Sequence, residues 1–157
     1  MKAYCPVLRN GKYLPTKYAI DTVQGGRNVS PPVSWGEIPG NTKAFALTLI
    51  EGGKPSGSNV HWIVANMSIA ARDLAEGVSG LRDRLPKGSL ELRNSFGKLG
   101  YTGPHASPAG GPREYQLTVY ALTNTMDVGP FSVYADFAEQ LKKRVAGQGS
   151  AILTLLV

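Results

Sequence analysis

The two histidines of this 157-residue chain, His61 and His105, are the side chains best suited to exchange a proton or bind a ligand near neutral pH. His61 precedes Trp62 at the start of an apolar stretch, and His105 lies in a segment rich in glycine and proline. A hydrogen-bonded histidine in the core and a solvated histidine on the surface are the ordinary alternatives. The sequence spacing leaves a ligand role and a purely structural role open for each residue.

The sequence carries none of the common local signatures of an enzyme. It has no Gly-x-Ser-x-Gly turn, no Walker loop, no Gly-x-Gly-x-x-Gly after a strand and no His-x-x-x-His spacing. With two histidines and the single cysteine Cys5, a zinc site would need carboxylates at no recognisable spacing. We therefore expect a protein that is not an enzyme and has no metal and no cofactor. A hydrolase that uses His61 or His105 as its base is an alternative to a protein without enzymatic activity.

Composition predicts one soluble, β-rich domain over residues 1–157. An apolar fraction of 42% and a charged fraction of 18% are typical of a globular protein of this size. The 19 glycines and 11 prolines are spread along the chain and favour many turns and short strands. Because the sequence lacks a signal-like start, a membrane-spanning apolar stretch and a second cysteine, we expect a cytoplasmic protein without integral membrane segments.

The net charge of +6 raises the question of a nucleic-acid partner. The basic residues are dispersed, and only Lys142, Lys143 and Arg144 form a run. That run falls at the end of a predicted helix, where cations complement the helix dipole. Since no basic patch is interleaved with aromatic residues, we expect no nucleic-acid binding.

Four segments have the length and composition of strands. They are short, apolar or alternating, and rich in aromatic and β-branched residues. These segments are residues 44–50, 61–67, 115–122 and 152–157. Together they predict a mainly β fold.

One helix is expected, over residues 133–146. Ser132 can cap its start and Gly147 can close its end. Its apolar side chains recur every four residues and should pack one face on the sheet. These side chains are Val133, Phe137, Leu141 and Val145.

Two long segments are expected to be irregular. Residues 69–85 are polar and contain Gly77 and Gly80, which predicts a loop with at most a helical turn. Residues 94–112 are rich in glycine and proline. Because long loops in compact domains often carry function, we expect a site in this second segment.

Several blocks of sequence, in order and at matching spacing, resemble the phosphatidylethanolamine-binding protein family. The later blocks resemble its bacterial and archaeal Raf-kinase-inhibitor-like branch, and the resemblance covers about residues 5 to 150. The blocks are residues 30–35, 46–48 with 55–57, 61–66, 93–104 and 111–115.

The resemblance implies a β-sandwich with a C-terminal helix and short peripheral helical turns. It also implies a small pocket for phosphate-like anions, in a family whose members act mostly as binders and inhibitors. Carried over by position, the pocket would contain His61, Gly103, Pro104 and His105. The implied partners are a small anion or phosphorylated ligand and a kinase or protease, and a homodimer is a further implied alternative.

Two departures from the family pattern bear on this pocket. Where the family has Asp-Pro-Asp-Ala-Pro, this chain has Glu51 in place of the first acid and Gly53 in place of the second. Where the family has Gly-x-His-Arg-Tyr, Arg113 takes the histidine position and Glu114 the arginine position. An arginine offers a permanent charge and a planar fork for phosphate. It could instead pair with Glu51 or Glu114 and close the pocket.

These observations favour a protein that holds a small phosphate-like anion, with kinase-inhibitor-like regulation implied by the resemblance alone. Loss of the second acid disfavours phosphatidylethanolamine itself. The alternative is a protease inhibitor that acts through the surface loops 52–59 or 103–111. The expected site residues are Glu51, His61, Gly103, Pro104, His105 and Arg113.

Overall fold

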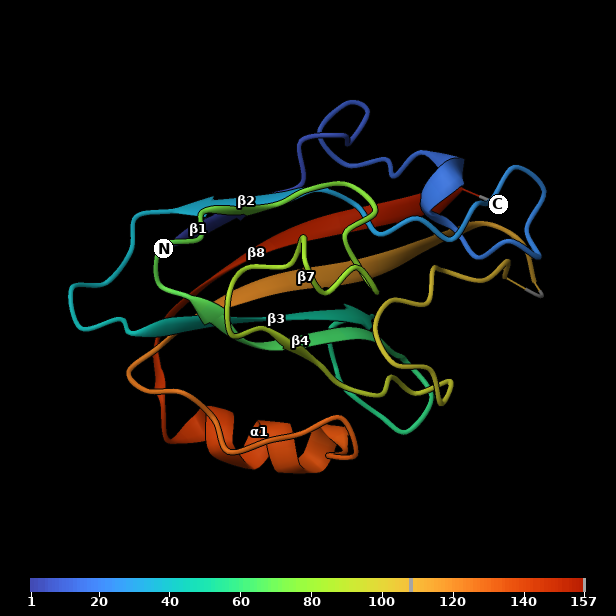
Figure 1. The fold of residues 1–157 in the computed structure, drawn as a ribbon. Helices are drawn as coiled ribbons and strands as arrows, with labels where there is room; N and C mark the ends of the chain where they lie inside the picture. Colours follow the sequence, from blue (N-terminus) through green and yellow to red (C-terminus); the bar gives the residue numbers. More distant parts are fainter. Residues whose placement is uncertain (108, 157) are drawn as a thin grey trace.

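The computed structural model describes residues 1–107 and 109–156 and shows two antiparallel sheets packed face to face (Figure 1). The larger sheet has the strand order β6-β4-β3-β7-β8, and the smaller sheet has the order β1-β2-β5. The mainly β sandwich expected from the sequence is confirmed.

The large sheet provides most of the regular structure. Its strands are β3 (Ala44–Glu51), β4 (Val60–Ser68), β6 (Leu90–Glu91), β7 (Pro112–Leu122) and β8 (Val145–Leu156). The small sheet consists of β1 (Lys2–Tyr4), β2 (Val33–Gly36) and β5 (Asp73–Leu74). The helical elements are a 3-10 turn, η1 (Thr16–Tyr18), and the helix α1 (Tyr134–Lys142).

Strand β3 is buried on both faces, which explains its continuous apolar run. Phe45, Leu47 and Leu49 face the core between the two sheets. Ala44 and Ala46, on alternate positions, face a second core beneath α1. Figure 1 shows α1 below β3 and β4, so the helix covers that half of the large sheet.

The helix prediction was right in its position and wrong at both ends. Val133 rather than Ser132 is the N-cap, and the helix ends at Lys142 with Lys143 as the C-cap. Val145 and Gly147, expected to finish the helix, instead pair with Leu122 and Ala121 of β7. Pairing with β7 therefore determines the structure of these residues, although the four-residue spacing of apolar side chains predicted a helix.

Because β8 starts at Val145, the last strand is much longer than the expected residues 152–157, of which residue 157 lies outside the described part of the chain. It also follows α1, so the helix is not the last element. Within residues 1–107 and 109–156, no helix is long and apolar enough to cross a bilayer.

A segment near the start of the chain is joined to the last strand and to the glycine-rich segment. Leu14 N donates to the Thr154 carbonyl at 2.8 Å, and Thr154 N donates to the Lys12 carbonyl at 2.8 Å. Ile20 N donates to the carbonyl of Pro104 at 3.0 Å. In Figure 1 the residues around η1 and the segment 93–107 lie at the same end of the sandwich.

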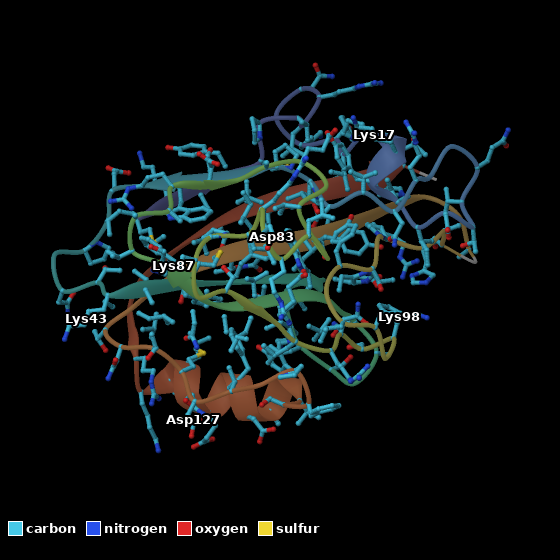
Figure 2. All side chains as sticks on the ribbon, in the orientation of Figure 1. Lys17, Lys43, Asp83, Lys87, Lys98 and Asp127 are labelled. Carbon is cyan, nitrogen blue, oxygen red and sulfur yellow. The ribbon has the colours of Figure 1, made fainter. Side chains whose placement is uncertain are left out.

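The charged residues do not gather on one element. Figure 2 labels Lys17 in η1, Lys43 at the opposite end before β3, and Lys98 in the glycine-rich segment, well apart from one another. The excess of positive charge inferred from the sequence is therefore dispersed in space at these positions.

Candidate ligand-binding site

His61 lies at the start of β4, and its side chain is 1% exposed. Its Nδ1 donates to the Thr102 carbonyl at 2.7 Å, and Thr102 N donates to the His61 carbonyl at 3.0 Å. Because a carbonyl can only accept, Nδ1 carries the proton and Nε2 presents a lone pair. No residue of 1–107 or 109–156 forms a hydrogen bond with Nε2. The sequence left His61 open between core and ligand roles, and the structure leaves this nitrogen without a hydrogen-bond partner in the described residues.

Burial lowers the pKa of His61 below its ordinary value, and the Thr102 hydrogen bond only partly offsets this effect. The imidazole is therefore neutral near pH 7. A neutral ring with Nδ1 protonated accepts a hydrogen bond at Nε2, so its natural partner is a ligand with an O–H or N–H group.

Three aromatic rings lie around that of His61. The centroid of its ring is 5.2 Å from that of Tyr115, 4.9 Å from that of Phe96 and 6.0 Å from that of His105. Phe96 and His105 are themselves 4.7 Å apart, and Phe96 is 37% exposed. Phe96 and His105 therefore form the outer side of a cluster whose inner side is His61 and Tyr115.

Tyr115, on β7, has a buried hydroxyl without a hydrogen-bond partner in the described residues. Burial raises the pKa of this phenol to about 12, and the nearby Glu51 carboxylate acts in the same direction. The hydroxyl therefore keeps its proton near neutral pH and stays a donor. An unpaired buried polar group costs about 1–3 kcal/mol, and such groups in native structures often mark a ligand or water position.

Tyr115 was not among the residues expected from the sequence, because a tyrosine in an apolar strand is usually part of the core. One signal was available. Arg113 and Tyr115 are two residues apart on β7, and alternate residues of a strand share a face. A site that includes Arg113 therefore places Tyr115 beside it.

Arg113 forms an ion pair with Glu51, one of the two alternatives that the sequence left open. Its Nε and Nη2 both donate to Oε1 of Glu51, at 2.8 Å and 2.6 Å. Its Nη1 donates to the carbonyls of His105 and Ala106, at 3.2 Å each. The other acid considered, Glu114, is exposed and forms no ion pair in the described residues. Arg113 thus fastens residues 105–106 to the end of β3.

The geometry of β3 and β7 brings the ion pair together. Glu51 is the last residue of β3 and stands opposite Tyr115 in the register of the two strands. The side chains of Glu51 and Arg113 are 28% and 25% exposed, so their attraction is only partly screened by water. The charge of Arg113 is therefore already balanced in the absence of ligand.

Gly103 and Pro104 hold the backbone of the segment in place rather than presenting functional side chains. A Cβ on Gly103 would lie 2.4 Å from the Tyr18 carbonyl oxygen and 2.6 Å from Ile20 N, so only glycine fits there. Gly103 N donates to Oδ1 of Asn28 at 2.7 Å. The segment beside His61 is therefore packed directly onto the chain after η1.

Asn94 organises the other half of this segment. Its Nδ2 donates to the Gly100 carbonyl at 3.0 Å and to Oγ1 of Thr102 at 2.8 Å. Its Oδ1 accepts from Phe96 N at 2.9 Å and from Lys98 N at 3.1 Å. This buried amide fixes both Thr102, which orients His61, and Phe96, which covers it.

Two hollows flank the site. One, of about 480 Å³, is lined by Phe96, Thr102 and His105 among others. The second, of about 550 Å³, is lined by Glu51 and Arg113 among others. Arg113 lines the second hollow and binds the carbonyl of His105, which lines the first. No group of three or more His, Cys, Asp or Glu side chains suited to a metal ion occurs in the described part of the chain.

The depressed pKa of His61 makes stability depend on pH. The folded protein resists protonating His61, whereas the unfolded chain takes up the proton near pH 6.5. The free energy of unfolding should therefore fall as the pH decreases from 7.5 to 6. Urea denaturation measures this slope, and His61→Gln should show a shallower one. An equal slope in the variant would contradict the assignment.

Comparisons with known proteins agree with this architecture. The sequence model of the phosphatidylethanolamine-binding protein family matches residues 5–155. A UPF0098 protein of Methanothermobacter thermautotrophicus is 34% identical over 139 residues, which cover 88% of this chain and 87% of the relative. The UPF0098 protein YbhB of Escherichia coli is 36% identical over 124 residues, 78% of each chain.

A solved structure shares the whole fold. The crystal structure of YbcL from Escherichia coli, described as a new member of the mammalian PEBP family, has a TM-score of 0.88 and 27% identity, covering 99% of this chain and 98% of that chain. With the family match over residues 5–155 and the bacterial and archaeal relatives, this chain belongs to the bacterial and archaeal branch of the phosphatidylethanolamine-binding protein family.

Proposed function

We propose that the protein binds a small phosphate-like anion at Tyr115 and His61, beneath the segment 103–107, and acts as a binder rather than as a catalyst. The observation that carries this proposal is the buried Tyr115 hydroxyl, a donor without an acceptor in the described residues, on a ring whose centroid is 5.2 Å from that of His61. A ligand oxygen in this position would satisfy the donor and remove the penalty of leaving it unpaired.

The two groups have complementary hydrogen-bonding roles. Tyr115 donates, and neutral His61 accepts. A partly protonated phosphate or phosphate monoester offers both an oxygen acceptor and an O–H donor. Sulfate offers acceptors only near neutral pH. The site should therefore prefer phosphate to sulfate at pH 7.

The ion pair between Arg113 and Glu51 determines how an anion can reach the site. The guanidinium of Arg113 can join the ligand only if the ligand competes with the Glu51 carboxylate for its donors. The two hydrogen bonds from Arg113 to the carbonyls of residues 105 and 106 are long, at 3.2 Å each, and are the weakest of the hydrogen bonds that Arg113 donates. Movement of these residues is the simplest way to admit the anion.

Kinase-inhibitor-like regulation is proposed on the strength of the family resemblance, as an action that the bound anion or a phosphorylated protein segment would control. A location in the cytoplasm stays a prediction from the sequence. The family's name refers to a phosphate-bearing head group, which supports the ligand chemistry proposed for this chain.

A protease inhibitor acting through the loop 52–59 is the second candidate. Asn59 braces this exposed loop, since its Nδ2 donates to the carbonyls of Glu51 and Lys54 at 2.9 Å and 2.6 Å. Its Oδ1 also accepts from Ser56 N at 2.7 Å. A braced exposed loop suits insertion into a protease cleft. In that case, substitutions on this loop should abolish inhibition and His61→Gln should not.

Replacement of Tyr115 by phenylalanine tests the anion site through two changes of opposite sign. Removing the unpaired hydroxyl should raise the free energy of unfolding by about 1 kcal/mol, because a buried unsatisfied group is lost. The same change should weaken phosphate binding about tenfold, because the ligand loses a donor. Urea denaturation measures the first effect, and phosphate titration followed by the amide chemical shifts of Thr102, Gly103 and His105 measures the second.

Tyr120→Phe is the matched control. Tyr120 lies on the same strand, and its hydroxyl lies 3.4 Å from Oγ1 of Thr48, away from His61. This variant should bind phosphate as the unaltered protein does. If Tyr115→Phe leaves the affinity unchanged, or if phosphate perturbs neither His61 nor residues 102–105, the proposal is wrong.

A further inference from the structure

A second cavity, apart from the site at His61, lies between the first turns of α1, the loop before β4 and the turn 93–97. Its volume is about 710 Å³, within the usual range of small-molecule sites, about 300–1,000 Å³. Residues from all three segments line it, including Val60, Arg93, Ser95, Val133, Tyr134 and Ala138.

The walls of this cavity are mainly apolar. Val60, Val133 and Ala138 contribute aliphatic surface, and Tyr134 contributes an aromatic ring. The Ser95 hydroxyl is already engaged, since it accepts from Val60 N at 2.9 Å. None of the lining residues is an aspartate or a glutamate. An apolar ligand body therefore gains by leaving water here, and a cationic ligand would find no counter-charge.

Arg93 supplies one positive charge at this cavity. Its side chain is exposed, its Nη1 donates to the Gly97 carbonyl at 3.1 Å, and its guanidinium stands 5.6 Å from the ring centroid of Phe131. No carboxylate of residues 1–107 or 109–156 forms an ion pair with Arg93. The charge of Arg93 is therefore held in position by a ring and a carbonyl without being neutralised.

We propose that this cavity binds a small carboxylic acid with an aromatic or alkyl body, with the body against α1 and the carboxylate on Arg93. A single guanidinium matches one carboxylate in charge and in its two-pronged geometry. Arg113, in the site at His61, is already paired with Glu51, whereas Arg93 has no carboxylate among the described residues that a ligand must displace. The two sites therefore differ in the kind of ligand that they favour. They also differ in whether an ion pair must open before the ligand binds.

Titration with 4-phenylbutyrate and with its neutral analogue 4-phenylbutan-1-ol tests this proposal. The carboxylate should bind about tenfold more tightly than the alcohol, since it gains a charge-assisted contact. Both should shift the amide resonances of residues 133–135 and 138, which line this cavity and not the site at His61. Equal affinity for the acid and the alcohol, or shifts confined to other residues, would overturn the proposal.

Three variants separate the charge from the cavity. Arg93→Gln should remove the preference for the acid over the alcohol. Lys98→Gln removes the same charge from the residue that follows this turn, but Lys98 does not line the cavity, so the preference should stay. Ala135→Leu, at an exposed lining position, should weaken both ligands several-fold by filling space. If Arg93→Gln still binds phenylbutyrate more tightly than the alcohol, Arg93 does not bind the carboxylate.

Discussion

Replacing Glu51 by glutamine should tighten phosphate binding by about ten- to hundredfold. In the free protein one oxygen of Glu51 takes two donors of Arg113, so an entering anion must compete with an internal carboxylate. Glutamine keeps the shape but loses the charge, and releases Arg113 for a phosphate oxygen. A hydrogen bond to a charged group contributes about 1.5–3 kcal/mol, which corresponds to this range of affinity. Calorimetric titration with inorganic phosphate measures the change.

Glu114→Gln is the control for this experiment. Glu114 is exposed on the same strand, next to Arg113, so its replacement removes the same net charge without freeing the guanidinium. Its effect should be no more than about twofold, as for a screened surface charge. Adding Arg113→Gln to Glu51→Gln should cancel the gain. An equal increase in both single variants would show that general electrostatics, and not competition for Arg113, governs affinity.

Shortening Phe137 to alanine should lower the free energy of unfolding by about 3–5 kcal/mol. Phe137 is the fully buried residue of α1 and fills the core between the helix and the outer face of β3 and β4. The substitution would leave a cavity among tightly packed neighbours of this core, such as Ile63, Leu122 and Met126, and a buried cavity lowers the free energy of unfolding. Urea denaturation, followed by circular dichroism, measures the loss.

Phe131→Ala removes the same ring from the loop before α1, where it is 81% exposed. Its effect on the free energy of unfolding should lie within about 0.5 kcal/mol. Because the core under α1 is distinct from the one between the sheets, folded Phe137→Ala protein should bind phosphate with unaltered affinity. A loss below about 1 kcal/mol would mean that α1 contributes little to the fold.

The strands of the central sheet were predictable because apolar runs and β-branched residues mark them directly. The end of α1 was not. Val145 continues the four-residue spacing of the helix, but its backbone pairs with Leu122 of β7, a contact more than twenty residues away in sequence. Local periodicity in the sequence does not reveal such a distant partner. The predicted helix was therefore too long, and the predicted last strand too short.

The candidate site was likewise predictable only in part. Resemblance selected His61, Arg113 and Glu51, and the structure brings these residues to one end of the large sheet. The choice of Glu51 over Glu114 as the partner of Arg113 depends on the pairing of β3 with β7, which spacing alone does not reveal. Tyr115 was missed because only three-dimensional burial shows that its hydroxyl lacks an acceptor.

The bonds of residues 12–14 to Thr154, and of Ile20 to Pro104, have a consequence for how the molecule reaches its native state. On the ribosome, the residues around η1 leave the exit tunnel long before their partners are synthesised. Closing such distant contacts carries a loop entropy that local helices avoid, and chains dominated by them refold slowly. The bonds that join residues 12–14 to β8 should accordingly form only after the last strand has been synthesised, and refolding should be slow compared with that of a helical protein of the same size.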